Sequence, residues 1–210
     1  GIGPLDIGAR RQPVIDHQMR RGGGGKETLF HEREAHKGDG EQPPGQAHGT
    51  PAMAQRAREP FAIGGADPAG FDFIASPLGR SRETLEIIRR EMGLPQDGYR
   101  TADAIIEISF GDWEGFTLEE LWADDPVLVK SRKKDKWHFV APNAESYARL
   151  AERTVPYIET LERDSVIVSH GGTMRTIIQT LEGTDRQEMA KFSVPQDKVY
   201  CWDGENGSWY

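Results

Sequence analysis

The stretch at residues 164–183, DSVIVSHGGTMRTIIQTLEG, constrains the fold of this chain more than any other. The run at 165–168 is short, apolar and β-branched, and it predicts a buried strand. After SHGG at 169–172, apolar residues recur with the spacing of a buried helix face: Met174, Ile177, Ile178 and Leu181. A strand that passes through glycines into a helix is typical of open α/β sheets, which bind ligands at the carboxyl ends of their strands.

His170 and Gly171 stand at this junction between strand and helix. Glycines let the backbone approach a ligand closely, and the first turn of a helix offers unpaired N–H groups and the positive end of its dipole. We expect both residues to face a phosphate or carboxylate group. A capped histidine in a surface turn is the alternative for this motif taken alone.

The chain from residue 71 onward predicts strands that alternate with helices. Thr117 and Glu120 form a capping box, and Pro156 should kink or interrupt its helix. The expected elements are a strand at 71–76, a helix at 81–95, a strand running into a loop at 103–115, helices at 117–126, 145–163 and 185–192, and a closing hairpin at 198–210. This order favours an α/β fold with a mostly parallel sheet covered on both faces.

Residues 1–70 differ from the rest in composition. They hold 14 of the 24 glycines and only two of the aromatic residues, Phe30 and Phe61. Segments such as RRGGGG and HKGDGEQPPGQAHG are rich in turn formers and poor in residues that could fill a core. We therefore expect an atypical segment at 1–70, either disordered or frame-shifted, in place of the first strand of the sheet, followed by an α/β domain at 71–210.

The charge of the chain limits its partners. Residues 1–70 carry nine basic and nine acidic residues, so residues 71–210 account for the whole net charge of −8. An acidic domain argues against nucleic acid or an anionic membrane as the main partner. The single cysteine, Cys201, excludes an intrachain disulfide. No apolar run or leader pattern indicates a membrane or an export route, so we expect a soluble, cytoplasmic protein, and its oligomeric state is left open.

Two further clusters carry candidate chemistry. In ASPLGRSRETLE, Arg80 precedes a helix start, where its planar guanidinium could bind two phosphoryl oxygens at once; a solvated helix end is the alternative. In IIEISFGDWEG, Glu107 interrupts an apolar run, and a buried carboxylate must be paired or have a raised pKa. A glutamate with a raised pKa is a natural general acid, whereas a structural ion pair is the alternative for Glu107 alone.

Other types of site fit the sequence poorly. The basic run KSRKKDKWHF at 130–139 is expected to be a solvated face, with a lid that attracts an anionic substrate as the alternative. His170 has no histidine or cysteine at metal-ligand spacing, and we expect no metal site. The GxxxxGK[ST], GxGxxG and GxSxG patterns are absent from the sequence.

Taken together, SPLGRSRET, EISFGDWEG, ESYARLAER and VIVSHGGTMRTII, in this order and spacing, resemble the histidine phosphatase superfamily, the phosphoglycerate-mutase-like enzymes. The resemblance covers about residues 71–210. It implies a three-layer αβα sandwich with a mostly parallel sheet, and a mechanism without metal or cofactor. In that mechanism a histidine attacks the phosphoryl group of a small phosphorylated substrate, and water or a second alcohol removes it.

Residue by residue, the resemblance implies that Arg80 clamps phosphate, Glu107 protonates the leaving oxygen and His170 binds the phosphoryl group. The nucleophile of the family lies in an Arg-His-Gly motif after the first strand, and no RHG occurs here. His17, His31 and His48 are the histidines near the expected place, and AHGT at 47–50 is the closest string. APNAES at 141–146 also departs from the glycine pair common before the family's GES helix.

Two explanations remain for the missing motif. A reading-frame shift in a GC-rich gene would produce such a break, and translation of the coding DNA in its other frames tests it; a natural divergent segment is the rival. The sequence thus predicts a phosphomonoester phosphatase, with mutase activity less expected. The alternative is a non-catalytic protein that binds phosphate or a partner and retains the fold.

Overall fold

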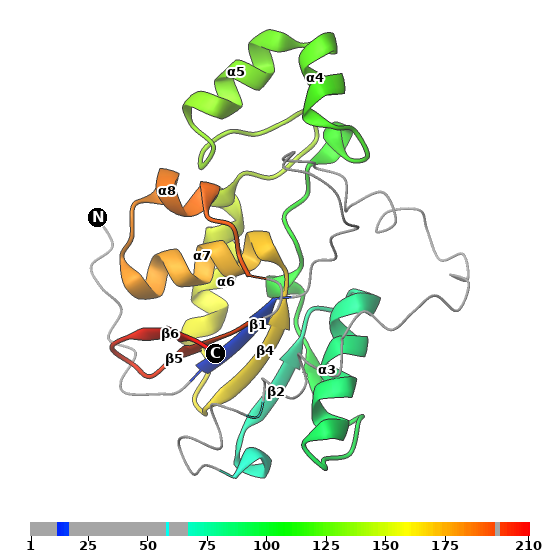
Figure 1. The fold of residues 1–210 in the computed structure, drawn as a ribbon, viewed down its shortest axis with the longest axis vertical. Helices are drawn as coiled ribbons and strands as arrows, with labels where there is room; N and C mark the ends of the chain where they lie inside the picture. The colour runs from blue at the N-terminus through cyan, green and yellow to red at the C-terminus, as the bar shows by residue number, and fades with distance from the viewer. Residues whose placement is uncertain (1–11, 17–57, 59–66, 196–197) are drawn as a thin grey trace.

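The computed structural model describes residues 12–16, 58, 67–195 and 198–210. Within them, six strands form one sheet in the order β3-β2-β4-β1-β5-β6 (Figure 1). The strands are β1 (Gln12–Asp16), β2 (Asp72–Ala75), β3 (Arg100–Thr101), β4 (Ser165–Ser169), β5 (Val199–Trp202) and β6 (Gly207–Trp209). The fold is α/β, as the sequence predicts.

The first four strands in the sheet order are parallel. Strand β4 pairs with β2 on one side, where Ile167 lies opposite Ile74, and with β1 on the other. The strands β5 and β6 are antiparallel and form the closing hairpin expected at 198–210. The carboxyl ends of β1, β2 and β4 therefore meet at one edge of the sheet, here called the carboxyl edge (Figure 1).

The expectation that the chain lacks a first central strand is wrong. Strand β1 lies between β4 and β5 in the sheet, parallel to β4 and antiparallel to β5. Residues 12–16 contain a single pair of β-branched apolar residues beside a proline, which is too little to predict a strand. Pairing on both sides makes this segment a strand. The remainder of 1–66 lies outside the described residues apart from 58.

Helices cover both faces of the sheet (Figure 1). On one face α6 (Tyr147–Glu159), α7 (Gly171–Glu182) and α8 (Arg186–Lys191) lie over Ile74 and Ile167. On the other face α3 (Gly79–Glu91) packs on Phe73 and Val166, the neighbours of those residues along β2 and β4. Alternating residues of a strand point to opposite faces, so each of these two strands contributes to both cores.

The segment from Thr117 to Lys134 forms a helical hairpin beyond the carboxyl edge of the sheet (Figure 1). It contains α4 (Leu118–Asp124) and α5 (Pro126–Lys134). The predicted capping box is present, since Thr117 Oγ1 accepts from the Glu120 amide and the Glu120 carboxylate accepts from the Thr117 amide.

The strand predicted at the start of 103–115 is not a strand. The chain forms a 3-10 helix, η3 (Asp103–Ile105), then runs irregularly to a second, η4 (Gly111–Trp113). Side chains take up the backbone carbonyls that a neighbouring strand would have used. Thr154 Oγ1 donates to Ala104 O at 3.0 Å, and Thr173 Oγ1 donates to Ile106 O at 3.1 Å.

Proline does not interrupt the long helix. α6 runs continuously from Tyr147 to Glu159 with Pro156 inside it, so of the expected kink or interruption the interruption does not occur. Its buried residues Leu150, Thr154 and Ile158 recur every fourth position and pack inward, which offsets the loss of one backbone hydrogen bond. No helix in the described part of the chain is both long and apolar enough to cross a membrane.

Candidate active site

His170 lies at the carboxyl edge, where β4 ends and α7 begins. It directly follows Ser169, the last residue of β4, and is the N-cap of α7 with an extended backbone. Its side chain is fully buried. The Nε2 atom lies 2.7 Å from Ser76 Oγ and 3.3 Å from Ser81 Oγ. Two serine hydroxyls thus hold the imidazole ring against the end of β2 and the start of α3.

The two serines come from the segment that contains Arg80. Ser76 follows β2 and donates its amide to Val168 O at 2.9 Å, so it is fixed to the neighbouring strand. Ser81 is buried in the first turn of α3, and its hydroxyl lies 3.5 Å from Ser169 O. The predicted phosphate-binding segment and the predicted phosphate-binding histidine are therefore in direct contact.

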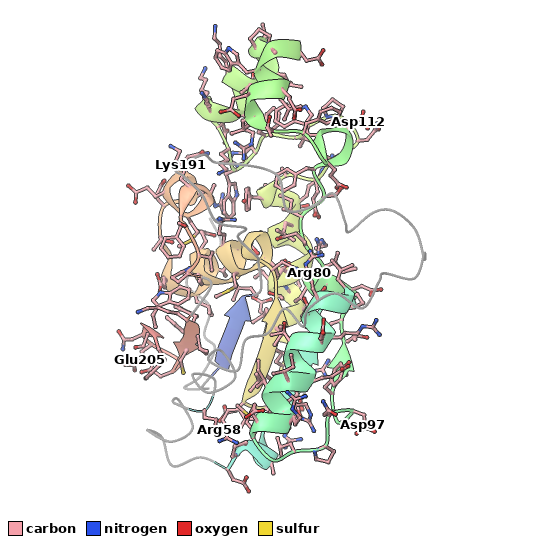
Figure 2. The ribbon with its side chains drawn as sticks, turned by 45° about the vertical axis from the view of Figure 1, so that its right-hand side comes forward. Arg58, Arg80, Asp97, Asp112, Lys191 and Glu205 are labelled. Carbon is pink, nitrogen blue, oxygen red and sulfur yellow. The ribbon has the colours of Figure 1, made fainter. Side chains whose placement is uncertain are left out.

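Arg80 is half-buried in the first turn of α3. Figure 2 shows it at the end of α3 that lies beside the tips of the strands. Its carbonyl accepts from Thr84 Oγ1 at 2.8 Å, an ordinary contact within the helix. Its position beside Ser81 brings a guanidinium to the same edge of the sheet as His170.

Glu107 is buried, with 8% of its surface exposed. Its Oε1 atom accepts from the Ile108 amide at 2.9 Å, and its Oε2 atom accepts from the Gly172 amide at 3.3 Å. Gly172 is the second residue after His170 and belongs to the first turn of α7. The carboxyl group is therefore held at the N-terminal end of the helix that His170 caps.

Position 172 requires glycine, because Glu107 and Ile108 lie too close to its backbone to leave room for a side chain. A Cβ atom there would lie 2.8 Å from Ile108 Cγ2 and closer still to Glu107 Oε1. Both neighbours are buried, so neither could move aside easily. Gly171 is also buried and precedes it as the first residue of α7. Of the two glycines, the structure gives Gly172 a specific reason to lack a side chain.

The segment before Glu107 is fastened by Arg153 of α6. The guanidinium donates to Ala104 O and Ile106 O at 2.8 Å each, and more weakly to Glu107 O at 3.3 Å. It also forms a salt bridge with Glu145, with Nε 2.9 Å from Oε1. Sequence reasoning missed Arg153, because ESYARLAER also offers Arg149 and no pattern distinguishes the two.

The loop 142–146 adopts its turn without the expected glycine pair. Asn143 has a φ of 57°, in the left-handed region that asparagine tolerates better than most residues. Its Nδ2 atom donates to the Asp112 carboxylate at 3.0 and 3.1 Å. Asp112 in turn donates its amide to Pro142 O at 3.0 Å. Asn143 thus adopts the turn without glycine, and its hydrogen bonds to Asp112 hold the loop against η4.

The basic run at 130–139 is only partly a solvated face. Arg132 and Trp137 are buried, and Trp137 stacks on Tyr147 with ring centroids 5.8 Å apart. Burial raises the pKa of Tyr147, and the negative charge of Glu107 raises it further against the opposing effect of Arg175. The start of α6 therefore links the end of this run to the vicinity of Glu107.

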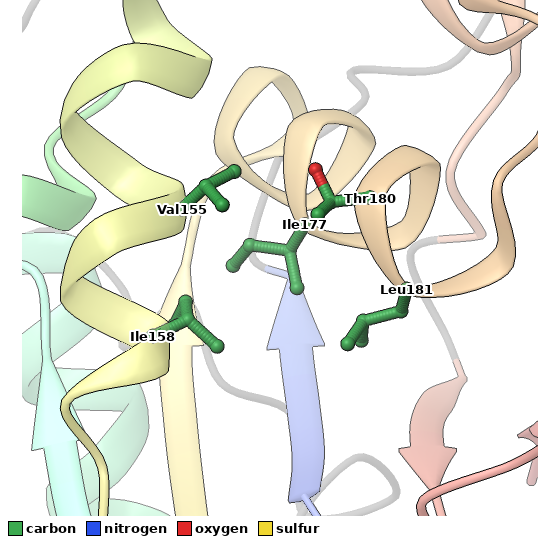
Figure 3. A pocket seen from close by; sticks show the side chains of 5 residues that line it. All are labelled: Val155, Ile158, Ile177, Thr180 and Leu181. Carbon is green, nitrogen blue, oxygen red and sulfur yellow. The ribbon is translucent and has the colours of Figure 1, made fainter. Parts of the chain in front are cut away.

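An apolar hollow lies between α6 and α7, away from these polar groups (Figure 3). It is lined by Val155, Ile158, Ile177, Thr180 and Leu181. It offers no charged group for a phosphate. Within the described residues, no three His, Cys, Asp or Glu side chains gather as metal ligands would.

The three histidines considered as nucleophiles, His17, His31 and His48, lie outside the described residues. The sheet register nevertheless bears on one of them. Asp16 at the end of β1 pairs with Ser169 at the end of β4. The residues that follow these two in the sequence are His17 and His170.

Comparison with known proteins was made for the sequence and for the fold. The family described as "Histidine phosphatase superfamily (branch 1)" matches residues 50–210, so the match begins upstream of the expected boundary at 71. A phosphoglycerate mutase of Schizosaccharomyces pombe is 27% identical over 67% of this chain and 72% of its own length. A 6-phosphofructo-2-kinase/fructose-2,6-bisphosphatase of Arabidopsis thaliana is 32% identical over 57% of this chain, which spans only 16% of that relative.

Solved structures share the fold at low sequence identity. A mycobacterial glucosyl-3-phosphoglycerate phosphatase superposes with a TM-score of 0.66 at 19% identity, covering 96% of both chains. Structures of that phosphatase with VO3 and with inorganic phosphate match as well. An alpha-ribazole phosphatase from Shigella flexneri has a TM-score of 0.61 at 22% identity, covering 91% of this chain and 89% of its own.

Proposed function

The chain belongs to the histidine phosphatase superfamily, and on that premise we propose that it is a phosphomonoester phosphatase acting through a phosphohistidine. One observation carries this proposal. The segments of Arg80, Glu107 and His170 meet at the carboxyl edge, through the contact of Ser81 with His170 and that of Gly172 with Glu107. Phosphoryl transfer depends chiefly on positioning and on charge stabilisation, which such a cluster can supply.

In this proposal Arg80 and His170 bind the phosphoryl oxygens. The Arg80 guanidinium bonds two oxygens and offsets their charge. When the Ser76 hydroxyl donates to His170 Nε2, the imidazole proton resides on Nδ1, which in this proposal is the atom that donates to the phosphoryl group. The amide of Gly171, in the first turn of α7, adds a backbone donor and the positive end of the helix dipole.

Glu107 serves as the general acid. The nucleophile forms a bond to phosphorus as the P–O bond to the leaving group breaks, and the Glu107 carboxyl group gives its proton to the departing oxygen. Water then attacks the phosphohistidine. Glu107, now a carboxylate, takes a proton from that water. Inorganic phosphate is released, and the free histidine and the protonated Glu107 are regenerated. A second alcohol in place of water would give mutase activity.

His17 is the nucleophile in this scheme. Its support is the sheet register, which pairs Asp16 with Ser169 directly before His17 and His170 in the sequence. In the sequence, Asp16 and Gln18 flank His17 where the family motif has arginine and glycine. We expect turnover to be weaker than the family motif supports, because an acidic residue replaces a basic one next to the nucleophile in the sequence.

The first test is hydrolysis of p-nitrophenyl phosphate at mildly acidic pH. In the second, the reaction is quenched rapidly and the phosphoenzyme is treated with acid or with base to see which treatment removes the phosphoryl group. Wild-type protein should release nitrophenol and form an acid-labile phosphohistidine. His170→Ala should abolish release and His17→Gln should abolish the phosphoenzyme, whereas His31→Gln and His48→Gln should retain both. If only the His31 or only the His48 variant loses the phosphoenzyme, that histidine is the nucleophile in place of His17.

A specific observation favours a second candidate function, phosphate binding without turnover. The sequence contains no Arg-His-Gly motif, and the family match begins only at residue 50. Calorimetric titration with inorganic phosphate separates the two functions. Binding that is lost in Arg80→Ala, together with no nitrophenol release by the wild type, supports the second candidate and excludes the first.

A further inference from the structure

We propose that Arg153 is a positioning residue for the general acid: its guanidinium fixes the backbone from which the Glu107 side chain extends. This inference rests on the proposed function, because it assigns Glu107 the role of acid. Arg153 is the last residue of ESYARLAER and lies on α6, a different element from the segments of Arg80, Glu107 and His170.

The guanidinium of Arg153 contacts the backbone along the segment 103–107, which leads to Glu107. From one end to the other it donates to the carbonyls of Asp103 at 3.4 Å, Ala104 at 2.8 Å, Ile106 at 2.8 Å and Glu107 at 3.3 Å. These carbonyls belong to η3 and to the irregular stretch after it, with which none of the six described strands pairs. Arg153 therefore replaces a strand partner at this place.

The planar fork suits this task better than an ammonium group would. Nε and Nη2 contact the two oxygens of Glu145 at 2.9 and 3.0 Å, and this ion pair orients the plane of the guanidinium. The remaining N–H groups then point at the carbonyls. A lysine would keep the charge but could not satisfy a carboxylate and several carbonyls with a fixed geometry.

Glu145 extends the same support to the far side of Glu107. Its amide donates to Ser109 O at 2.9 Å, so the stretch 103–109 is held both before and after the acid. The Glu107 carboxyl group is in turn located by the amides of Ile108 and Gly172. A shift of the backbone would move the carboxyl group relative to α7, and a general acid must lie within hydrogen-bond reach of its proton acceptor.

The test compares two leaving groups in Arg153→Lys and Arg153→Ala. An alkyl phosphate needs a proton on its leaving oxygen, whereas p-nitrophenolate leaves without one. We expect kcat for the alkyl phosphate to fall by roughly tenfold or more in both variants, since general acid catalysis contributes about 10²–10⁴-fold. The kcat for p-nitrophenyl phosphate should change by less than about threefold, by the same leaving-group argument.

Arg163→Ala is the matched control. Arg163 also donates to a backbone carbonyl, that of Gly70 at 2.7 Å, and pairs with a carboxylate, that of Asp72 at 3.1 Å, but it lies at the opposite end of the sheet. It should leave the ratio of the two kcat values unchanged. Equal losses on both substrates in the Arg153 variants would overturn the positioning role and leave a merely structural one.

A second measurement keeps the inference testable if the wild type has no turnover. Hydrogen exchange of the Ile108 and Gly172 amides reports whether the Glu107 carboxyl group still accepts from them. We expect faster exchange at both amides in Arg153→Lys, with the exchange of α3 unchanged. Unchanged exchange at Ile108 and Gly172 overturns the inference, whereas an inactive wild type with the expected exchange overturns only the proposed phosphatase function.

Discussion

The Nε2 atom of His170 lies 2.7 Å from the Oγ atom of Ser76, across the boundary between β4 and β2. A buried hydroxyl at this distance orients the imidazole ring, and the nitrogen that carries the ring proton depends on whether the hydroxyl donates or accepts. The pair joins two segments 94 residues apart in the sequence. It is the most direct of the contacts that bring the candidate site together.

Ser76→Ala should lower kcat/KM for p-nitrophenyl phosphate by about tenfold, since a buried hydrogen bond contributes about 1–2 kcal/mol. The imidazole would lose the partner that orients it, while the fold would remain. Steady-state kinetics measure the effect. Ser131→Ala removes an exposed hydroxyl bonded to Val127 O and serves as the control. An equal loss in both variants would contradict an orienting role for Ser76.

Gly172→Ala should lower both stability and turnover. The added Cβ would meet Glu107 and Ile108, and overpacking of this kind costs about 1–3 kcal/mol. Denaturant unfolding measures the first effect, and hydrolysis of an alkyl phosphate measures the second. Gly70→Ala places a methyl group where no atom lies within 4 Å, so it should change neither. A fully active Gly172→Ala variant would show that Glu107 does not need its present position.

Restoring the family motif should raise activity. Asp16→Arg combined with Gln18→Gly converts DHQ to RHG and replaces a carboxylate, which repels phosphate, by a guanidinium that attracts it. We expect kcat/KM for p-nitrophenyl phosphate to rise at least tenfold, since a tenfold rise needs about 1.4 kcal/mol and one donor placed at a developing charge contributes about 2.7–4 kcal/mol. Asp39→Arg with Gln46→Gly makes the same changes of charge and composition elsewhere. A rise that this control reproduces would be an effect of net charge alone.

Asp135 should make stability depend on pH in the acid range. Hydrogen bonds from the His138 amide, and then from the Gln187 and His138 side chains, lower the pKa of Asp135 against the opposing effect of burial. A carboxyl group with a lowered folded-state pKa stabilises the protein above its unfolded value of 3.8, and this contribution disappears as the pH falls through the folded pKa.

Asp135→Asn should therefore lower Tm at pH 7, and this effect should shrink as the pH falls below 3.8 through the lower folded-state pKa. Thermal melts of both proteins across this range measure the difference. Asp124→Asn, which changes an exposed carboxylate at the end of α4, is the control and should show a smaller effect at neutral pH. A difference that persists unchanged to pH 3 would contradict the assigned direction of the pKa shift.

The sequence predicted the elements whose patterns are local. An apolar run predicts the strand before His170, and apolar residues spaced three and four apart predict the helix after it. The structure has these elements as β4 and α7. The helix after Thr117 follows from its capping box. In these elements a residue's neighbours along the chain decide its conformation, so a pattern within a few residues is sufficient.

The failures have the opposite cause. The stretch at 103–108 reads as a strand, but Arg153, Thr154 and Thr173 from two distant helices bind its carbonyls. Strand β1 has a weak pattern of its own and depends on pairing with β4 and β5. Arg153 lies in ESYARLAER, which does not distinguish it from Arg149. Such features depend on which distant segments meet, and periodicity does not contain that information.

The central position of β1 couples the two ends of the chain. Val14 pairs with Ile167 on one side and with Tyr200 on the other, so the sheet joins residues separated by almost the entire polypeptide. Contacts of such long sequence separation form late, because the closure entropy of the intervening loop must be paid first. The sheet is consequently completed only when β5 pairs with β1, and until then β1 presents an open edge that is vulnerable to association with other chains.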